Sequence, residues 1–142
     1  MWRRVSNLVN NLITYKTLSP DMRLRRRVNQ TLRQRPYLEA NQWFKMFWQD
    51  QDISPVTAEF AYSRFAEYSG IQFGRVLPSD RLEEDLSWTE VCWFDWEFSF
   101  CEDVEAQFGF DISDCFYDQM LHTVADLVSF LDSQIQQQAC LR

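Results

Sequence analysis

Apolar residues spaced three and four positions apart recur along most of this chain, as they do in amphipathic helices. The first such stretch covers residues 2–13. Further helices are predicted from 20 to about 34, over 37–48, from 55 to 69, and from 124 to about 135. Three glycines and four prolines are too few for a β fold with many turns. The pattern therefore predicts an all-α protein.

Several of these helices have recognisable ends. Serine followed by proline at 19–20 and at 54–55 predicts a capping residue and then proline in the first helical position. Gly70 is placed to stop the helix that begins at 55. The spacing of Thr123 and Asp126 resembles a capping box at the start of the last helix.

An aromatic-rich run over 88–108 fits two periodicities. Alternate residues fit a strand, whereas spacing of three and four fits one face of a helix. The acidic end of the run and the absence of a turn favour one helix over 88–108, which Gly109 ends. Residues 70–86 are predicted to form a loop, and 111–120 a loop or short helix. In the helix over 55–69, the side chains expected to face inward are those of Val56, Phe60, Phe65 and Tyr68. In the loop over 70–86, those of Ile71, Phe73 and Leu77 are expected to be buried.

Charge divides the chain into two blocks. Residues 1–45 carry ten Lys and Arg against two acids, a balance of +8, and residues 46–142 carry four against nineteen, a balance of −15. Together these balances make up the net charge of −7. The basic block is densest at Arg23, Arg25, Arg26, Arg27, Arg33 and Arg35.

The arginine-rich stretch has several interpretations. It can fold back on the acidic block, form a solvated face, or bind a protein or an anionic membrane surface peripherally. The candidates for partner contact in this stretch are Arg23, Arg26 and Arg27. Nucleic acid is the least favoured partner, because the attached acidic block competes for the same arginines and repels phosphates.

Metal and catalytic signals are absent from the sequence. The four cysteines form no Cys-x-x-Cys pair, and His122 has no cysteine at ligand spacing. No phosphate-binding loop, nucleophile elbow or HExxH motif occurs. Neither a membrane span nor a convincing signal peptide is visible. We therefore expect a cytoplasmic protein that is not an enzyme and holds no metal or cofactor.

Three motifs in the second half of the chain carry a resemblance to a known family. They are Glu-Asp-Leu at 84–86, Phe-Gly at 108–109 with Ile112 soon after, and Thr-Val-Ala-Asp-Leu at 123–127. Their order over 54–131 resembles the acyl carrier proteins, and is similar to short acyl-carrier-like bacterial proteins without an assigned function.

The resemblance implies a division of the chain. It implies an acyl-carrier-like four-helix bundle over 52–135. The basic helices over 1–50 are then an N-terminal extension, and residues 136–142 are expected to be a frayed tail because they end the last helix.

The serine that carriers modify has no counterpart here. Counting forward from the Glu-Asp-Leu motif reaches Glu90, and counting back from the Phe-Gly motif reaches Phe94, so the chain holds one extra helical turn. Trp93, Phe94 and Asp95 stand where the serine is expected. Ser87 is the nearest alternative site for phosphopantetheine, but it lies too early and lacks the carrier's sequence context.

These observations lead to a hypothesis and two alternatives. The chain is predicted to be an interaction protein, an adaptor or assembly factor, whose partner is another protein or an oppositely charged surface of a second copy. The alternatives are an acyl carrier that uses Ser87, and a basic helix that binds nucleic acid or an anionic membrane. The candidate partner-binding residues are Trp93, Trp96, Phe100, Arg23, Arg26 and Arg27. Burial of the aromatic run under the N-terminal helices is the structural alternative to an exposed interface.

Overall fold

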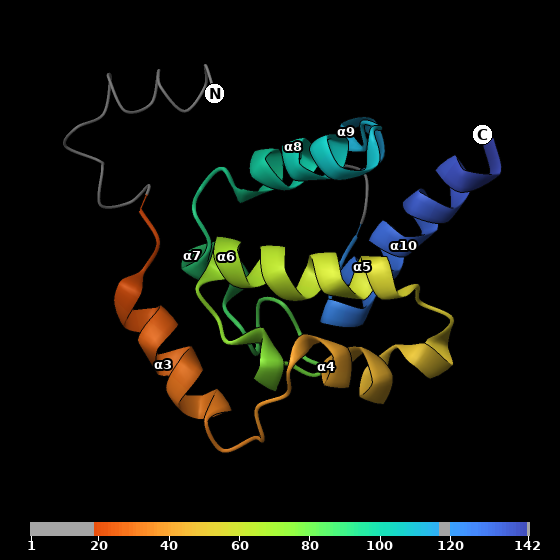
Figure 1. Ribbon diagram of the computed structural model, residues 1–142. Coiled ribbons are helices and arrows are strands. Elements are labelled where there is room, and N and C mark those ends of the chain that lie inside the picture. Colours follow the sequence, from red (N-terminus) through yellow and green to blue (C-terminus); the bar gives the residue numbers. More distant parts are fainter. Residues whose placement is uncertain (1–18, 117–119, 142) are drawn as a thin grey trace, which may run out of the picture.

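A computed structural model describes residues 19–116 and 120–141 (Figure 1). The helices are α3 (Met22–Leu32), α4 (Ala40–Phe47), α5 (Pro55–Phe60), α6 (Ala66–Ser69), α7 (Trp88–Val91), α8 (Trp96–Phe108), α9 (Ser113–Phe116) and α10 (Val124–Leu141). The remaining helical segments are two short 3-10 turns, η1 (Gln49–Gln51) and η3 (Phe73–Arg75), and one π-helical turn, η2 (Ala61–Phe65). The described residues form no strand, which confirms the all-α prediction. The helix predicted over 2–13 lies outside them.

One helical rod made of α5, η2 and α6 forms the centre of the fold. Ser54 is its N-cap and Pro55 its first residue, as predicted. Gly70 ends it with a φ of 71°, a left-handed conformation that glycine adopts without strain. Asp132 of α10 fixes the start of the rod, because its carboxylate accepts hydrogen bonds from Ser54 N at 3.2 Å and Thr57 Oγ1 at 2.7 Å.

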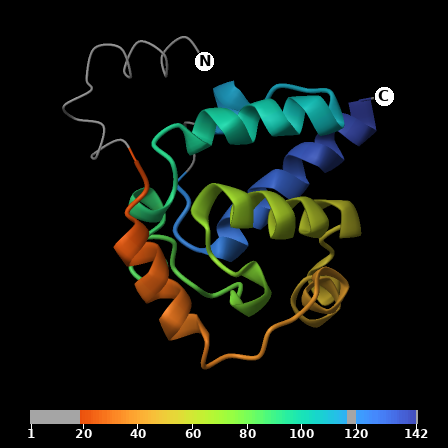
Figure 2. The same ribbon diagram turned by 60° about the vertical axis from the view of Figure 1, so that its left-hand side comes forward.

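The other helices pack around this rod. In both ribbon views α8 lies along one side of it and α4 on the other (Figures 1 and 2). Aromatic rings join the layers: Phe100 of α8 lies 6.2 Å from Phe60 and 5.4 Å from Phe65, centroid to centroid. On the opposite side, the ring of Trp43 in α4 lies 5.5 Å from that of Tyr62 in η2, centroid to centroid. The core is therefore built largely from aromatic contacts.

The loop after the rod is held against α4. Trp43 Nε1 donates to Val76 O at 2.9 Å, and Leu38 N donates to Gly74 O at 2.9 Å. A Cβ atom at Gly74 would collide with Leu38 O, so only glycine allows this close approach of the two backbones.

Two arginines attach the basic helix α3 to the rest of the chain. Arg25 Nε donates to Val91 O at 2.6 Å, and its Nη2 to Tyr68 O at 3.2 Å. Arg35 forms a two-pronged ion pair with buried Asp80, at 2.7 Å and 3.0 Å. The arginine-rich stretch thus folds back on the acidic block through these two residues.

The aromatic run over 88–108 is not one helix, and that prediction was wrong. Residues 92–95 break it into α7 and α8. At about 100° per residue, the buried side chains of α7 would point about half a turn away from those of α8 if the helix were continuous. These are Trp88 and Val91 in α7, and Phe100, Cys101 and Val104 in α8. The break lets both sets reach the same core.

Other helix limits differ from the predictions in smaller ways. The cap of α3 is Asp21, whose carboxylate accepts from Leu24 N at 3.1 Å, rather than Ser19. Helix α10 continues through Leu141, although the sequence predicts fraying from 136, because no glycine or proline interrupts the good helix formers there. Val56 is exposed, not inward, and Leu77 is only half-buried.

The capping box of the last helix is present as predicted. Thr123 N donates to Asp126 Oδ2 at 3.0 Å, and Asp126 N donates to Thr123 Oγ1 at 3.1 Å. These reciprocal bonds satisfy two amide groups at the start of α10.

The Arg35–Asp80 pair gives the first testable prediction. Asp80 is 4% exposed and also accepts from Leu77 N at 2.8 Å. Asp80→Asn should lower the free energy of unfolding by about 2 kcal/mol, because it leaves a partly buried guanidinium without its carboxylate. Urea denaturation measures the change. Asp85→Asn is the control, because Asp85 pairs with Arg81 on the surface, and an equal loss in both variants would contradict the prediction.

Candidate binding site

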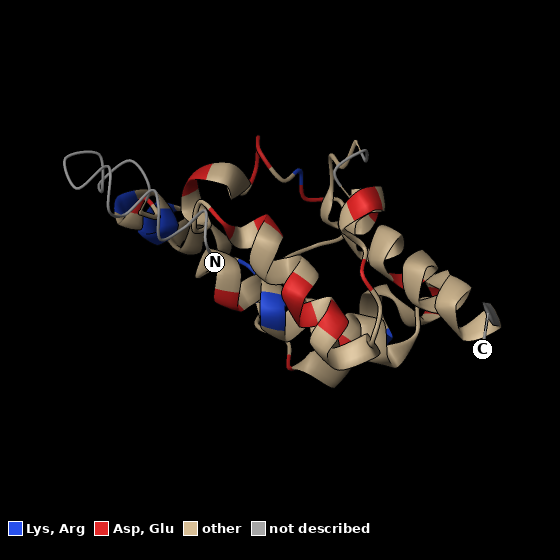
Figure 3. Cartoon of the chain, turned by 90° about the horizontal axis from the view of Figure 1, so that it is seen from above, with Lys and Arg blue, Asp and Glu red and all other residues tan. Residues whose placement is uncertain are grey.

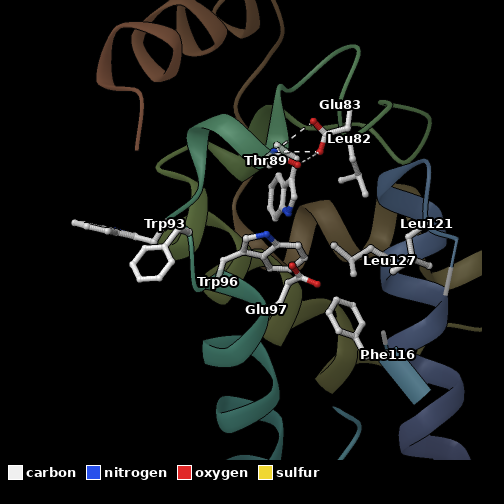
Figure 4. Close-up of a pocket in the computed structure, with 11 residues that line it drawn as sticks. Leu82, Glu83, Thr89, Trp93, Trp96, Glu97, Phe116, Leu121 and Leu127 are labelled. Carbon is white, nitrogen blue, oxygen red and sulfur yellow. Dashed lines mark hydrogen bonds between the residues drawn. The ribbon is translucent and has the colours of Figure 1, made fainter. Parts of the chain in front are cut away.

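The break between α7 and α8 places Trp93 on the surface. Trp93 is 39% exposed, and Figure 4 shows its ring directed away from Trp96. Two hollows adjoin it, and both include Trp93 and Trp96 in their walls. We call these the large hollow and the acidic hollow.

The large hollow has a volume of about 430 Å³ and lies between α7, the start of α8 and α10 (Figure 4). Its described lining residues are Leu82, Glu83, Trp88, Thr89, Trp93, Phe94, Trp96, Glu97, Phe116, Leu121 and Leu127. Trp96 meets Trp88 and Phe116 nearly at right angles, with centroid distances of 5.6 Å and 5.8 Å. The walls are therefore largely aromatic faces and edges.

Polar groups in the large hollow are few and distinct. The carboxylate of Glu83 accepts from Thr89 N at 3.1 Å and from the Thr89 hydroxyl. Glu97 supplies a second carboxylate, which lies between the rings of Trp96 and Phe116 in the view of Figure 4. The indole N–H of Trp88 is buried and has no acceptor among the described residues. The hollow thus combines aromatic walls with negative charge.

The acidic hollow, of about 310 Å³, lies on the other side of Trp93. Its described lining residues are Arg64, Glu67, Tyr68, Trp93, Asp95, Trp96, Ser99, Glu102 and Asp103. Tyr68 donates its hydroxyl to Asp103 Oδ2 at 2.5 Å. Burial, and then this hydrogen bond, raise the pKa of Tyr68 well above its usual value, so the phenol stays protonated.

Negative charge dominates both hollows. Two carboxylates line the large hollow and four line the acidic one. Arg64 is the one basic residue among their described lining residues, and it pairs with Glu67 at 3.4 Å. Figure 3 shows basic residues gathered on α3 and acidic residues spread over the remaining helices and loops. This face of the molecule therefore favours cations.

The three aromatic candidates, Trp93, Trp96 and Phe100, differ in how far their side chains are exposed. Trp93 is exposed and Trp96 half-buried, so both border the hollows. Phe100 is fully buried against Phe65 and Phe116 and belongs to the core, so it leaves the set of candidate contact residues. Phe98, which the sequence did not single out, is 41% exposed on α8 but borders neither hollow.

The remaining candidates lie elsewhere. Arg23, Arg26 and Arg27 are exposed on α3. Ser87 is the half-buried N-cap of α7, in a left-handed conformation with a φ of 53°, and its amide donates to Glu83 O at 3.1 Å.

The lining residues of the large hollow that were not among the sequence-based candidates are Leu82, Glu83, Trp88, Thr89, Phe94, Glu97, Phe116, Leu121 and Leu127. They come from three separate segments, and no local pattern connects them.

Cysteine and metal chemistry add no second site in the part of the chain that the structure describes. Burial raises the pKa of the Cys92 thiol, and raises that of Cys101 to about 11. Cys115 and Cys140 are exposed, and none of the four cysteines forms a disulfide. The described residues contain no cluster of His, Cys, Asp and Glu that could hold a metal ion.

Comparison of the chain with protein-family models, with curated proteins and with solved structures found no match. Among the described helices, none is both long enough and apolar enough to span a bilayer.

The Tyr68–Asp103 bond predicts a dependence of stability on alkaline pH. The folded state keeps the Tyr68 proton, whereas the unfolded chain releases it above about pH 10, so the free energy of unfolding falls as pH rises past this value. Tyr68→Phe should lose less stability than the unsubstituted chain between about pH 9 and 11. Denaturation curves of Tyr68→Phe and of the unsubstituted chain at both pH values measure the two losses in the free energy of unfolding. Burial also raises the pKa of Tyr62, but Tyr62 is present in the variant and in the unsubstituted chain, so its contribution is the same in both. Equal losses would contradict the assignment.

Proposed function

We propose that this chain is a non-enzymatic interaction protein, an adaptor or assembly factor, that binds a basic and partly apolar segment of another protein across Trp93. The observation that carries the proposal is an exposed tryptophan between two hollows with aromatic walls and six carboxylates. Exposed aromatic rings beside concave surfaces are typical of the residues that contribute most to protein interfaces.

Charge favours this class of partner. The hollows are negative, and the block that contains them carries a balance of −15. A basic segment is attracted to this surface over a distance of about 10 Å at ordinary ionic strength, whereas phosphate groups are repelled. Aliphatic carbons of the same segment can then pack on Trp93 and Trp96.

The order of the helices supports a degenerate acyl-carrier-like fold for 52–135. A long helix, a long loop, the helix α8, a short helix and a last helix follow each other in the order that the resemblance implies, with the one-turn helix α7 added between the loop and α8. Phe94 and Asp95 lie at the start of α8, where a carrier would present its serine. An aromatic and an acidic residue at this place support a carrier-derived surface that binds a partner and carries no prosthetic group.

A second copy of the chain also offers a basic segment of this kind. Helix α3 exposes Arg23, Arg26 and Arg27, and its fourth basic residue, Arg25, anchors it to α7. If α3 of one copy docked on the surface around Trp93 of another copy, the two unlike surfaces would form a head-to-tail contact. Sedimentation of the full chain at low and high salt distinguishes self-association from binding to a different protein.

A peptide with the sequence of residues 22–35 tests the proposed function, because it is basic and amphipathic. We expect saturable binding to the full chain with a Kd below about 1 mM, weakening as salt is added. Trp93→Ala should weaken binding about tenfold or more. Fluorescence anisotropy of the labelled peptide measures both effects.

Phe98→Ala is the matched control for this experiment. It removes an exposed aromatic ring from the same helix but outside both hollows, so it should leave the affinity unchanged. Absence of binding by the full chain, or an equal loss in both variants, would refute the proposal.

The carrier alternative can be tested by mass. Ser87 is half-buried in a left-handed turn, so a transferase has poor access to its hydroxyl. After incubation with coenzyme A and a phosphopantetheinyl transferase, the intact mass of the chain should not change. A gain of one phosphopantetheine that disappears in Ser87→Ala would establish a carrier instead.

A further inference from the structure

A stripe of exposed arginines runs along the outer face of α3. At about 100° per residue, its side chains leave the helix within about a third of the circumference. The members of this arginine stripe are Arg23, Arg26, Arg27 and Arg33, the last placed directly after the helix in a helical conformation. The opposite face carries Arg25, Val28 and Leu32, which attach α3 to the rest of the fold. Figure 3 shows these basic residues at one edge of the molecule.

The arginine stripe has no counter-charge within the described part of the chain. None of its four guanidinium groups has a hydrogen bond or an ion pair with a described residue. Asp21 is the one acid over 19–38, and its carboxylate caps the helix by accepting from Leu24 N. Like charges so close together repel each other, so negative groups supplied from outside would stabilise this face.

The residue type indicates which negative groups suit the stripe. All four positions hold arginine, whose planar guanidinium donates two parallel hydrogen bonds to a phosphate or a carboxylate. From Arg23 to Arg33 the stripe extends about 15 Å along the helix axis, a straight row that fits a flat surface. Met22, at the N-terminal end of this row, is 59% exposed. An apolar side chain beside basic ones suits the boundary between lipid headgroups and acyl chains.

The sequence before α3 distinguishes a lipid surface from other anionic partners. Residues 1–18 contain three basic residues and no acid, and apolar residues recur at helical spacing over 2–13. This segment joins the stripe at its N-terminal end, because α3 begins at Met22. A basic amphipathic sequence is typical of helices that lie in a membrane interface. Its apolar residues have no counterpart in the phosphate backbone that dominates binding to nucleic acid.

We infer that the arginine stripe and residues 2–13 together bind the surface of an anionic membrane. The guanidinium groups contact lipid phosphates, and the apolar side chains of 2–13 enter the boundary of the acyl chains. The acidic block lies behind α3, where screening over about 10 Å limits its repulsion by the lipids. No member of the stripe lines the large or the acidic hollow, so this surface goes beyond the proposed function.

Two signals are needed because each is weak alone. A basic residue near an anionic surface strengthens binding about fivefold, so four arginines give a weak contact that salt removes. Apolar side chains buried in the interface add to this without depending on salt.

Flotation of the full chain with lipid vesicles tests the inference. Vesicles of phosphatidylcholine with about one third phosphatidylglycerol should bind the chain at least about tenfold more strongly than phosphatidylcholine alone. Arg26→Gln combined with Arg27→Gln should weaken this binding about twentyfold, since each lost charge removes a factor of about five. The control is Lys45→Gln combined with Arg81→Gln, which changes the net charge equally at exposed positions outside the stripe. It should weaken binding less than about threefold.

A second pair of variants tests the apolar part. Leu8→Asn combined with Leu12→Asn leaves the charge unchanged and should weaken vesicle binding about tenfold or more, because two apolar side chains no longer enter the interface. Asn7→Gln combined with Asn11→Gln alters polar positions of the same segment and should have no effect.

Several outcomes would overturn the inference. Equal binding to neutral and anionic vesicles, or equal losses in the two charge variants, would exclude the stripe as the contact. An unchanged affinity of the leucine variant would exclude residues 2–13. Tighter binding to a DNA duplex than to vesicles, or self-association that the arginine variant abolishes while vesicles do not bind, would assign the stripe to nucleic acid or to a second copy. The Trp93 surface is tested separately by the peptide.

Discussion

The need to bury two aromatic-rich sets of side chains in one core governs this structure. The inward residues of α7 and those of α8 would lie on opposite sides of a continuous helix. Interrupting the helix at 92–95 turns both sets toward the rod made of α5, η2 and α6. The same interruption leaves Trp93 at the surface and opens the hollows on either side of it. The candidate site is thus a direct consequence of how the core is filled.

Charge has a different role in each half of the chain. Arg25 and Arg35 attach α3 to the acidic block through backbone carbonyls and the buried carboxylate of Asp80. The remaining arginines of α3 stay exposed, and the carboxylates of the large and acidic hollows form the opposite surface. Partial folding back therefore stabilises the position of α3 and still leaves two surfaces of opposite charge for intermolecular contact.

Much of the fold could be predicted from local signals. Ser54, Pro55 and Gly70 set the limits of the central rod, and Thr123 and Asp126 the start of the last helix, because caps and left-handed ends depend on residues close in sequence. The burial of Phe100 could not be predicted from such local signals. Its aromatic neighbours in sequence look alike, and only the direction of α8 relative to the rod decides which of them is buried.

The sequence by itself determined the helical class, most helix ends, the division of charge and the presence of more aromatic rings than a small bundle needs. Tertiary structure alone decided where the helix breaks, which rings remain outside and which carboxylates converge beside them. The reason is physical: helix ends are set by hydrogen bonds within a few residues, whereas a hollow is formed by side chains from segments far apart. Leu82, Trp96 and Leu127 line one hollow only because the core brings three segments together.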